Sequence, residues 1–257
     1  MISSWKNTRF DNIAFTSGEN FTHSFPDHFH EEYTIGVSVN GIQQFNLLNK
    51  EFIVAPHSIF LIKPGQMHAH HPIADLGWSF KSMYLSPDFV DHLLKGSEIK
   101  ADSAFVPVVQ DEELFNHYIN IHENKESDVE DRITSFLYSV YQRSTDNSLQ
   151  ASVISSSEKL DEIKAYLADH ITQKLNLDTI AGKFHIDKFQ LIRQFKKHTG
   201  VTPNVYLTIL RVECARRLMN QNHSLVETAF EAGFYDQSHF HHNFLYYTGV
   251  TPGSFVG

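Results

Sequence analysis

The pattern of hydrophobic and polar residues divides the chain into a strand-rich first part and a helical remainder. Over roughly the first 90 residues, short aromatic and β-branched runs end at Pro, Gly or Asn-Gly pairs, which is typical of strands separated by turns. The runs are Glu32–Val39, Glu51–Ala55, Ser58–Ile62 and Gly77–Leu85, and the Asn40-Gly41 pair favours a hairpin after the first. Several short strands at this spacing predict a small barrel or sandwich.

From Pro87 onward the apolar positions recur at helical intervals. Asp111–Asn124 and Asp128–Arg143 each have one apolar face, formed in the second by Val129, Ile133, Phe136, Leu137 and Val140. Such a face packs either on a second subunit or on the strands, so the pattern predicts a dimer interface with a cap over the strands as the alternative. The serine-rich stretch Ser144–Ser157 predicts a linker.

Beyond this stretch the sequence predicts a series of helices with clear start signals. They are expected at Glu158–His170, Asp178–Phe184, Asp187–His198, Pro203–Asn220, Ser224–Gly233 and Asp236–Tyr247. Asp187 is placed to cap the third helix, Thr202 precedes a proline at the first position of the fourth, and Ser224-x-x-Glu227 forms a capping box.

One pentapeptide, Thr-Gly-Val-Thr-Pro, occurs twice, at Thr199–Pro203 and Thr248–Pro252. Each copy follows a phenylalanine by the same interval, Phe195 and Phe244. Two copies of one helical unit therefore stand in tandem, fewer than the three or so that a solenoid needs. Two short helices joined by a sharp turn describe a helix-turn-helix, so the repeat predicts two recognition helices that face DNA.

Charge adds to this picture because it is unevenly distributed. The net charge is −9, and residues 1–157 contain 10 Lys and Arg against 20 Asp and Glu. Residues 158–257 contain 11 against 10, and the last 40 residues contain no Lys or Arg. Such asymmetry indicates different partners for the two parts of the chain.

The composition of the chain limits the cellular compartments in which we expect it. The chain contains no apolar run of about 18 residues, so we expect no membrane-spanning segment. The N-terminus lacks the organisation of a secretory signal. The lone Cys214 excludes an intramolecular disulfide and fits a reducing compartment. We therefore expect a cytoplasmic protein.

A spaced set of residues runs through both tandem units. It consists of Leu177-x-x-Ile180-Ala181, Leu191-x-Arg193-x-Phe195-Lys196-Lys197-x-x-Gly200-x-x-Pro203, Arg211-x-x-x-Ala215-x-x-Leu218, Ala229-x-x-x-Gly233-Phe234-x-Asp236-x-Ser238-x-Phe240-x-x-x-Phe244 and Gly249-x-x-Pro252. The set resembles the DNA-binding domain of the AraC/XylS family of bacterial transcriptional regulators and covers roughly the last 100 residues. The resemblance implies that Asp187–His198 and Asp236–Tyr247 are recognition helices.

In the first recognition helix, the resemblance implies that the bases face Phe189, Gln190 and Arg193. Arginine can fork onto guanine, glutamine onto adenine, and an aromatic ring can meet a thymine methyl group. Lys196 and Lys197 are expected to contact phosphate. The alternative for Phe189 is a place in the core, where we also expect Leu191, Phe195, Phe240 and Phe244.

The second recognition helix departs from the family pattern. Its expected base-facing residues are Gln237, Ser238 and His242, with His241 beside them, and His242 replaces the usual arginine. Leu245 and Tyr246 stand where the first helix has two lysines. Fewer phosphate contacts predict a weaker electrostatic contribution from this unit, so the first unit is expected to dominate affinity.

The first part of the chain carries a second, looser set of residues: His28-Phe29-His30-Glu31-Glu32-Tyr33, Asn40-Gly41 and Lys63-Pro64-Gly65-Gln66-Met67-His68. This set resembles the cupin-type sensor domain of the same family. It implies a pocket for a small organic effector, which we expect to be lined by His30, Tyr33, His68, Trp78 and Tyr84. His70 and His71 are expected in an exposed loop.

Metal-binding cupins offer a comparison for three of these histidines. His28, His30 and His68 stand where such cupins have metal ligands, and imidazoles suit a divalent transition metal. The usual glutamate position holds Thr34 or Ile35, while Glu31 and Glu32 come too early. We therefore expect no metal and no other cofactor, and keep the three histidines as candidates only.

Together these features predict an α+β protein of two domains. Residues 1–143 are expected to form a cupin-like β-barrel with accessory helices that senses an effector and dimerises. Residues 144–157 form the linker, and residues 158–257 form an all-α domain with two helix-turn-helix motifs. The expected function is ligand-responsive transcription regulation as an activator, with double-stranded DNA, a small organic effector, a second copy of the chain and RNA polymerase as partners. The alternatives are a cupin-type metal-dependent enzyme with a degenerate DNA-binding tail and a ligand-independent regulator.

Overall fold

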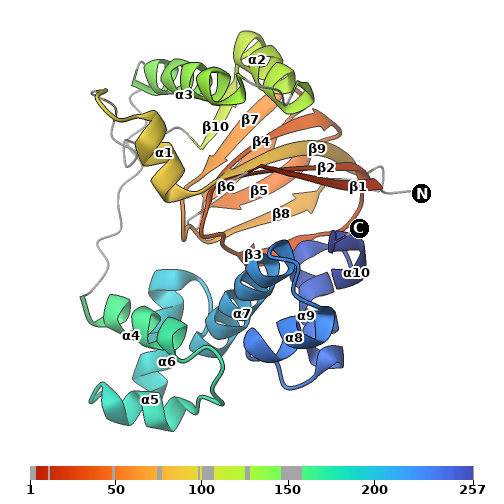
Figure 1. Cartoon of the computed structure of the whole chain (residues 1–257). Coiled ribbons are helices and arrows are strands. Elements are labelled where there is room, and N and C mark those ends of the chain that lie inside the picture. Colours follow the sequence, from red (N-terminus) through yellow and green to blue (C-terminus); the bar gives the residue numbers. More distant parts are fainter. Residues whose placement is uncertain are drawn as a thin grey trace. The chain divides into compact units, whose positions relative to one another are not determined.

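The computed structural model describes residues 4–10, 12–47, 50–73, 77–97, 99, 107–124, 128–145 and 158–256, and these residues form two compact units (Figure 1). The predicted linker lies outside the described residues from residue 146 onward. The N-terminal unit contains three helices and every described strand except Phe25–His28, and the C-terminal unit contains that strand and the remaining helices. The predicted α+β class with a sheet-rich first part and a helical second part is confirmed.

The described strands form two separate sheets. The larger has the order β1 (Ser4–Phe10), β2 (Ile13–Phe21), β9 (Trp78–Leu85), β4 (Tyr33–Asn40), β7 (Ser58–Ile62) and β10 (Val108–Gln110). The smaller has the order β3 (Phe25–His28), β8 (His68–Pro72), β5 (Gln43–Leu47) and β6 (Lys50–Val54). Because the sheets do not close on each other, the predicted barrel is wrong and a pair of packed sheets takes its place.

The predicted hairpin after Asn40 is also wrong, although the turn itself forms. Gly41 has a φ of 76°, and its N–H donates to the side chain of Asn40 at 2.8 Å. However, β4 pairs with β7 and β9 in the larger sheet, while β5 pairs with β6 and β8 in the smaller. The turn therefore carries the chain from one sheet to the other instead of joining two paired strands.

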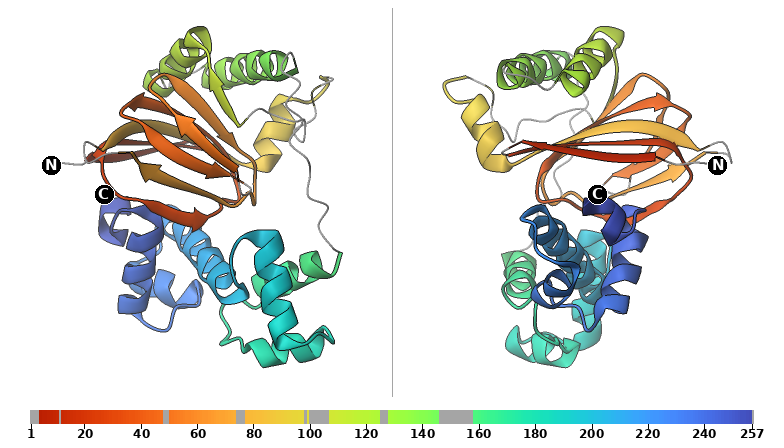
Figure 2. Two further views of the ribbon diagram at one scale, coloured as in Figure 1. Left: turned by 180° about the vertical axis from the view of Figure 1, so that it is seen from behind. Right: turned by 45° about the vertical axis from the view of Figure 1, so that its right-hand side comes forward.

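Helices α1 (Pro87–Leu93), α2 (Glu112–Glu123) and α3 (Val129–Thr145) belong to the N-terminal unit, and Figure 2 shows α2 and α3 over one face of the larger sheet. Their apolar sides share one core with alternate residues of β2, β4, β7 and β9. This core buries the four side chains of α3 that we expected to pair with a second subunit, Val129, Ile133, Phe136 and Val140. Pairing through them is therefore wrong, and the structure agrees with the alternative in which the helices cap the strands.

The other face of the larger sheet packs on the smaller sheet. Phe60 and Ile62 of β7 join Phe45, Leu47 and Val54 of the smaller sheet in a second core. Gly36 makes room for this packing, because a Cβ atom at that position would lie 2.0 Å from the ring of Phe60. The two cores fix which residues of each strand face the helices and which face the space between the sheets.

The C-terminal unit contains two helix pairs and a connecting helix. The first pair is α5 (Leu177–Lys183) and α6 (Lys188–Thr199), the second is α8 (Leu225–Glu231) and α9 (Gln237–Thr248), and α7 (Pro203–Asn220) joins them. Helix α4 (Glu158–Asp169) precedes the pairs, and the short α10 (Pro252–Val256), which the sequence pattern did not predict, follows them. The residues expected in the core, Leu191, Phe195, Phe240 and Phe244, are all buried.

The repeated pentapeptide ends both second helices in the same way. Gly200 and Gly249 adopt φ values of 85° and 72°, and their N–H groups donate to Lys196 and Leu245 at 2.9 and 2.8 Å. This is the left-handed glycine cap that stops a helix. The proline that follows in each copy then begins the next helix, α7 or α10.

The two sharp turns inside the helix pairs also match each other. In the first, the N–H of Ile186 donates to Ala181 at 3.0 Å, and in the second the N–H of Phe234 donates to Ala229 at 2.9 Å. The residue before each donor has a positive φ: 49° at His185 and 83° at Gly233. Both pairs therefore have helix-turn-helix geometry, as the tandem repeat predicts.

Candidate nucleic-acid interface and effector region

Helix α6 presents one polar face to solvent. Its predicted DNA-contacting residues, Phe189, Gln190, Arg193, Lys196 and Lys197, are all exposed, while Leu191 and Phe195 on the opposite side are buried. These five positions are separated by intervals of one, three and four residues, so they lie on one side of the helix. Phe189 is 77% exposed, which excludes the alternative that it belongs to the core.

The start of α6 is fixed by its cap. The side chain of Asp187 accepts the N–H groups of Phe189 and Gln190 at 2.9 and 3.0 Å, as the sequence predicts for an N-cap. The Lys188 ammonium pairs with Asp178 of α5 at 2.9 Å, which ties the two helices of the pair together. The remaining cations, Arg193, Lys196 and Lys197, are therefore presented from a helix whose start and partner are both fixed.

Helix α9 holds the equivalent place in the second helix pair but presents different side chains to solvent. Gln237, Ser238, His239, His241 and His242 are exposed, and the face carries no Lys or Arg. The side chain of Asp236 caps the helix by accepting the N–H of His239 at 2.7 Å. The imidazole, amide and hydroxyl groups exposed on α9 can donate and accept hydrogen bonds but carry no fixed positive charge.

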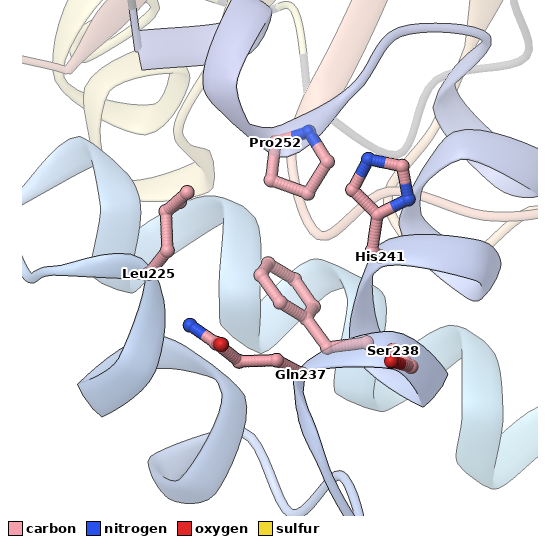
Figure 3. Close-up of a pocket in the computed structure, with 6 residues that line it drawn as sticks. Leu225, Gln237, Ser238, His241 and Pro252 are labelled. Carbon is pink, nitrogen blue, oxygen red and sulfur yellow. The ribbon is translucent and has the colours of Figure 1, made fainter.

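A surface pocket of about 410 Å³ opens at the start of α9. It is lined by Gln237, Ser238, Phe240 and His241 of α9 together with Leu225 of α8 and Pro252 of α10. Figure 3 shows the side chain of Gln237 directed toward Leu225 and the ring of His241 next to Pro252. Three of the four predicted DNA-contacting residues of this unit therefore line a single hollow on the surface of the second helix pair.

In the N-terminal unit, four of the five predicted effector residues belong to a continuous series of rings. His30 lies 5.2 Å from Tyr84 and 5.1 Å from His68 between ring centroids, and His68 lies 5.5 Å from His70. His70 in turn stacks on Trp78 at 5.8 Å. Tyr84 and Trp78 come from β9, and His68 and His70 from β8, so the series joins the two sheets.

Two expectations about this region need correction. Tyr33 lies next to Leu85 in the pairing of β4 with β9, and its ring packs on the core under the helices, so it faces away from the other four residues. His70 and His71 do not lie in an exposed loop but in β8. His70 is buried, stacks on Phe45 and forms a 2.8 Å hydrogen bond between Nδ1 and Gln43.

Known protein families match both units. The AraC-like ligand binding domain matches residues 12–138, and a helix-turn-helix domain matches residues 180–256. The chain is an AraC-family transcriptional regulator. Its function in this family is sequence-specific DNA binding by a helix-turn-helix domain, combined with a ligand-binding domain.

Individual relatives agree with the family. The uncharacterized HTH-type transcriptional regulator YbfI of Bacillus subtilis is 27% identical over 225 residues, which cover 84% of this chain and 81% of that protein. The HTH-type transcriptional activator RhaS of Salmonella paratyphi B is 37% identical over 95 residues, which cover 37% of this chain and 34% of that protein. Both relatives are transcription regulators by name.

Solved structures of ToxT from Vibrio cholerae share the fold of this AraC-family chain. One from strain O395 has a TM-score of 0.66 at 14% identity and covers 96% of this chain and 98% of ToxT. Another, of ToxT bound to an unsaturated fatty acid, has a TM-score of 0.62 at 15% identity and covers 95% and 94%. In the part of the chain that the structure describes, no helix is long and apolar enough to cross a membrane.

Proposed function

We propose that this AraC-family regulator binds two adjacent DNA boxes through α6 and α9 and that α6 supplies most of the affinity. Phe189, Gln190 and Arg193 read bases in the first box, and Gln237, Ser238 and His242 read bases in the second. Lys196 and Lys197 hold the phosphate backbone beside the first box. In the second, His241 is placed beside the base-reading face and contributes hydrogen bonds.

The observation that carries this proposal is the contrast between the exposed faces of α6 and α9, which are equivalent helices of two similar helix pairs. Both second helices contain 12 residues, begin at an aspartate cap and end at a left-handed glycine. Only α6 exposes fixed cations on its polar face. Because cations that meet phosphate release counterions, the affinity of the first unit depends strongly on salt and that of the second depends on it weakly.

Selection from random duplex DNA at fixed salt, followed by sequencing, tests the proposal. Enrichment of a bipartite motif with boxes about one helical turn apart supports reading by both units. Enrichment of a single box limits base reading to one unit, and the Arg193→Ala and His242→Ala variants identify which one. A library that shows no enrichment contradicts the proposal and favours the alternative of a cupin-type enzyme with a degenerate DNA-binding tail.

We also propose that the effector is a small organic molecule that contacts the ring series of the N-terminal unit, with His30, His68, Trp78 and Tyr84 as its partners. Aromatic rings offer apolar contact area, and the imidazoles and the Tyr84 hydroxyl offer hydrogen bonds. ToxT, which shares the fold, has been solved with an unsaturated fatty acid. An apolar molecule with a polar end group is therefore the first class of compound to test.

Tryptophan fluorescence provides a direct assay for this effector. The chain contains two tryptophans, and Trp78 is buried beside His70 and Phe80. A saturable change in emission on titration with one compound of a panel, weakened in Tyr84→Phe, supports the assignment. Binding that Tyr84→Phe and His30→Gln leave unchanged places the effector elsewhere.

We further propose a domain organisation, a location and a mode of regulation for this regulator. We divide the chain into a sensor domain at 1–143, a linker at 144–157 and a DNA-binding domain at 158–257, as the change of pattern along the sequence suggests. We propose that the regulator acts in the cytoplasm as a homodimer that activates transcription through RNA polymerase and has no catalytic activity. Sedimentation and in vitro transcription, with and without the effector, test the dimer and the direction of regulation.

A further inference from the structure

The surface pocket at the start of α9 combines an apolar lining with a polar one. Its volume of about 410 Å³ lies within the range of small-molecule sites in proteins. The apolar lining consists of Leu225, Phe240 and Pro252, and the polar lining consists of Gln237, Ser238 and His241. Phe240 is buried, so its ring belongs to the floor of the pocket, whereas the three polar residues are exposed. This lining matches a small molecule with an apolar face and a hydrogen-bonding edge.

The polar lining is particular to the second helix pair. Leu177 and Leu225 begin the first helix of each pair, and Asp187 and Asp236 cap the second, so the two pairs can be compared position by position. The apolar positions of the pocket hold residues of the same kind in the first pair: Leu177, Leu191 and Pro203. The three polar positions hold different residues there: Lys188, Phe189 and Ile192. The shared fold therefore does not require an amide, a hydroxyl and an imidazole at this place.

The charges near the pocket disfavour an anionic ligand. The last 40 residues contain no Lys or Arg. Asp236 and Glu227, which lie next to Gln237 and two residues after Leu225, place carboxylates at the starts of α9 and α8. Hydrogen bonds from the hydroxyl and the N–H of Ser224 hold the pKa of Glu227 below its usual range, so this carboxylate is ionised at neutral pH. A neutral ligand therefore fits this surface better than a phosphate or a carboxylate.

The amide of Gln237 indicates the kind of hydrogen-bonding edge. Figure 3 shows this side chain directed toward Leu225, within the pocket. A carboxamide presents an N–H donor and a carbonyl acceptor side by side. The matching edge is a ring nitrogen beside an amino group, the arrangement by which glutamine recognises adenine.

We propose that this pocket binds a neutral, planar heterocycle of the purine type, with its ring against the apolar lining and its amino edge on Gln237. Ser238 and His241 add hydrogen bonds at the rim. Gln237 and Ser238 are also proposed to face the second DNA box, so a bound heterocycle excludes DNA from α9 and leaves α6 able to bind. This effect on DNA rests on the proposed function, whereas binding of the heterocycle does not.

Calorimetric titration of the full chain without DNA tests the site, with adenosine as the probe. Saturable binding of one adenosine per chain is expected. Adenosine 5′-monophosphate is expected to bind more weakly because of its charge, and N6,N6-dimethyladenosine because it lacks the amino N–H groups. Absence of saturable adenosine binding overturns the proposal. Since these titrations contain no DNA, they test the pocket alone, while selection from random DNA tests the proposed function.

Three variants locate the bound adenosine. Ser238→Phe places in the pocket the aromatic side chain that the first pair has at the equivalent position, and is expected to abolish binding. Gln237→Leu is expected to weaken binding about tenfold, because two hydrogen bonds are lost. His239→Gln is the matched control, since His239 is exposed on the same helix but does not line the pocket. Circular dichroism shows whether each variant is folded. Adenosine binding that folded Ser238→Phe and Gln237→Leu leave unchanged overturns the proposal and assigns adenosine to another site.

Discussion

In the proposed mode of DNA binding, single residues account for the difference between the two similar helices α6 and α9. Arg193 and His242 occupy matching positions on α6 and α9 and both are exposed, but only the arginine carries a fixed charge. An arginine that forks onto guanine discriminates against the wrong base by about 1–3 kcal/mol. Under the proposal, the residue at this one position therefore accounts for much of the difference in DNA affinity between the two units.

We expect Arg193→Ala to weaken binding to the selected DNA by about 1–3 kcal/mol and to relax the base preference at one position of the first box. Lys196→Ala is the control. It is expected to weaken binding to all sequences alike and to reduce the slope of log affinity against log salt by about one. Fluorescence anisotropy at several salt concentrations separates the two effects, and an equal loss of specificity in both variants would contradict the assigned roles.

Gly233 is the residue on which the second sharp turn depends. Its φ is 83°, and a Cβ atom there would lie 2.3 Å from the carbonyl oxygen of Ile171. We expect Gly233→Ala to reduce the free energy of unfolding by roughly 1–3 kcal/mol, because the left-handed backbone disfavours a side chain and the contact adds strain. Urea denaturation measures the change.

His185 provides the matched control, since it holds the equivalent place in the first turn with a φ of 49°. His185→Gly is expected to change the free energy of unfolding by less than about 1 kcal/mol, because relief of the backbone is offset by the greater freedom of the unfolded chain. A Gly233→Ala variant as stable as the wild type would show that this turn adjusts to a side chain.

At the same scale, the sequence predicts exposure better than it predicts contacts. The helical period places Phe189 and Arg193 on the outside and Leu191 and Phe195 on the inside, as found. The histidines of β8 are different, because polar residues in a row indicate a loop. His70 is nevertheless buried, since strand pairing sets it opposite Phe45 and its Nδ1 atom meets Gln43. Pairings between distant strands leave no signal in the local pattern.

At the scale of elements, the cap of α2 joins that helix to α3. The Asp111 side chain accepts the N–H of Leu114 at 2.9 Å and pairs with Arg143 at 2.5 Å. Burial by itself raises the pKa of this carboxyl, but the hydrogen bond from Leu114 and the pairing with Arg143 outweigh it and hold the pKa below its usual range. The ionised carboxylate therefore stabilises the folded state.

We expect Asp111→Asn to destabilise the protein by about 1 kcal/mol near pH 7, a typical loss for a changed cap. A carboxyl with a lowered pKa in the folded state contributes stability above its unfolded pKa and loses it as the pH falls through the folded one. The difference between wild type and variant is therefore expected to shrink below about pH 4. Chemical denaturation across this range measures it, and a difference that does not change with pH would contradict the ionic contribution.

Elements with strong local signals agree best with the structure. Ser58–Ile62 is a strand with the predicted bounds, and Thr202 and Ser224 cap α7 and α8 as expected. The turn at Asn40-Gly41 forms as its residues predict, but local chemistry cannot tell which sheet the next strand joins. The sequence therefore predicts the turn and not the pairing, which is why the predicted barrel and hairpin are both wrong.

At the scale of the whole molecule, α7 connects the two helix pairs whose second helices, α6 and α9, are proposed to read DNA. It contains 18 residues, and a helix of that length spans roughly 27 Å at 1.5 Å per residue. It is capped at its start by Thr202 and held near its middle by Arg211, which donates to the carbonyl oxygens of Ile171 and Gln173 at 2.9 and 2.8 Å. If both α6 and α9 read DNA as proposed, a helix anchored in this way requires a fixed spacing between the two boxes.

We therefore expect insertion of five base pairs between the boxes to remove the contribution of the second box, because half a helical turn moves it to the opposite face of the duplex. Insertion of ten base pairs returns the second box to the original side of the duplex but leaves it farther from the first box. We therefore do not expect this insertion to restore affinity. Competition binding with the three DNA duplexes measures this. Equal affinity for the original and the five-base-pair duplex would mean that the second unit reads no bases.

The twin glycine caps have a consequence for engineering. Because α6 and α9 have the same length and lie between the same two kinds of turn, their outward-facing residues can be exchanged without changing the inward-facing ones. Substituting the exposed residues of α9 with those of α6 would give two recognition helices with the same exposed side chains. The preferred operator of this variant is expected to be a direct repeat. The exposed residues proposed to select the DNA sequence are therefore distinct from the buried residues that hold the fold. The exposed residues of one helix can be substituted while those of the other stay unchanged.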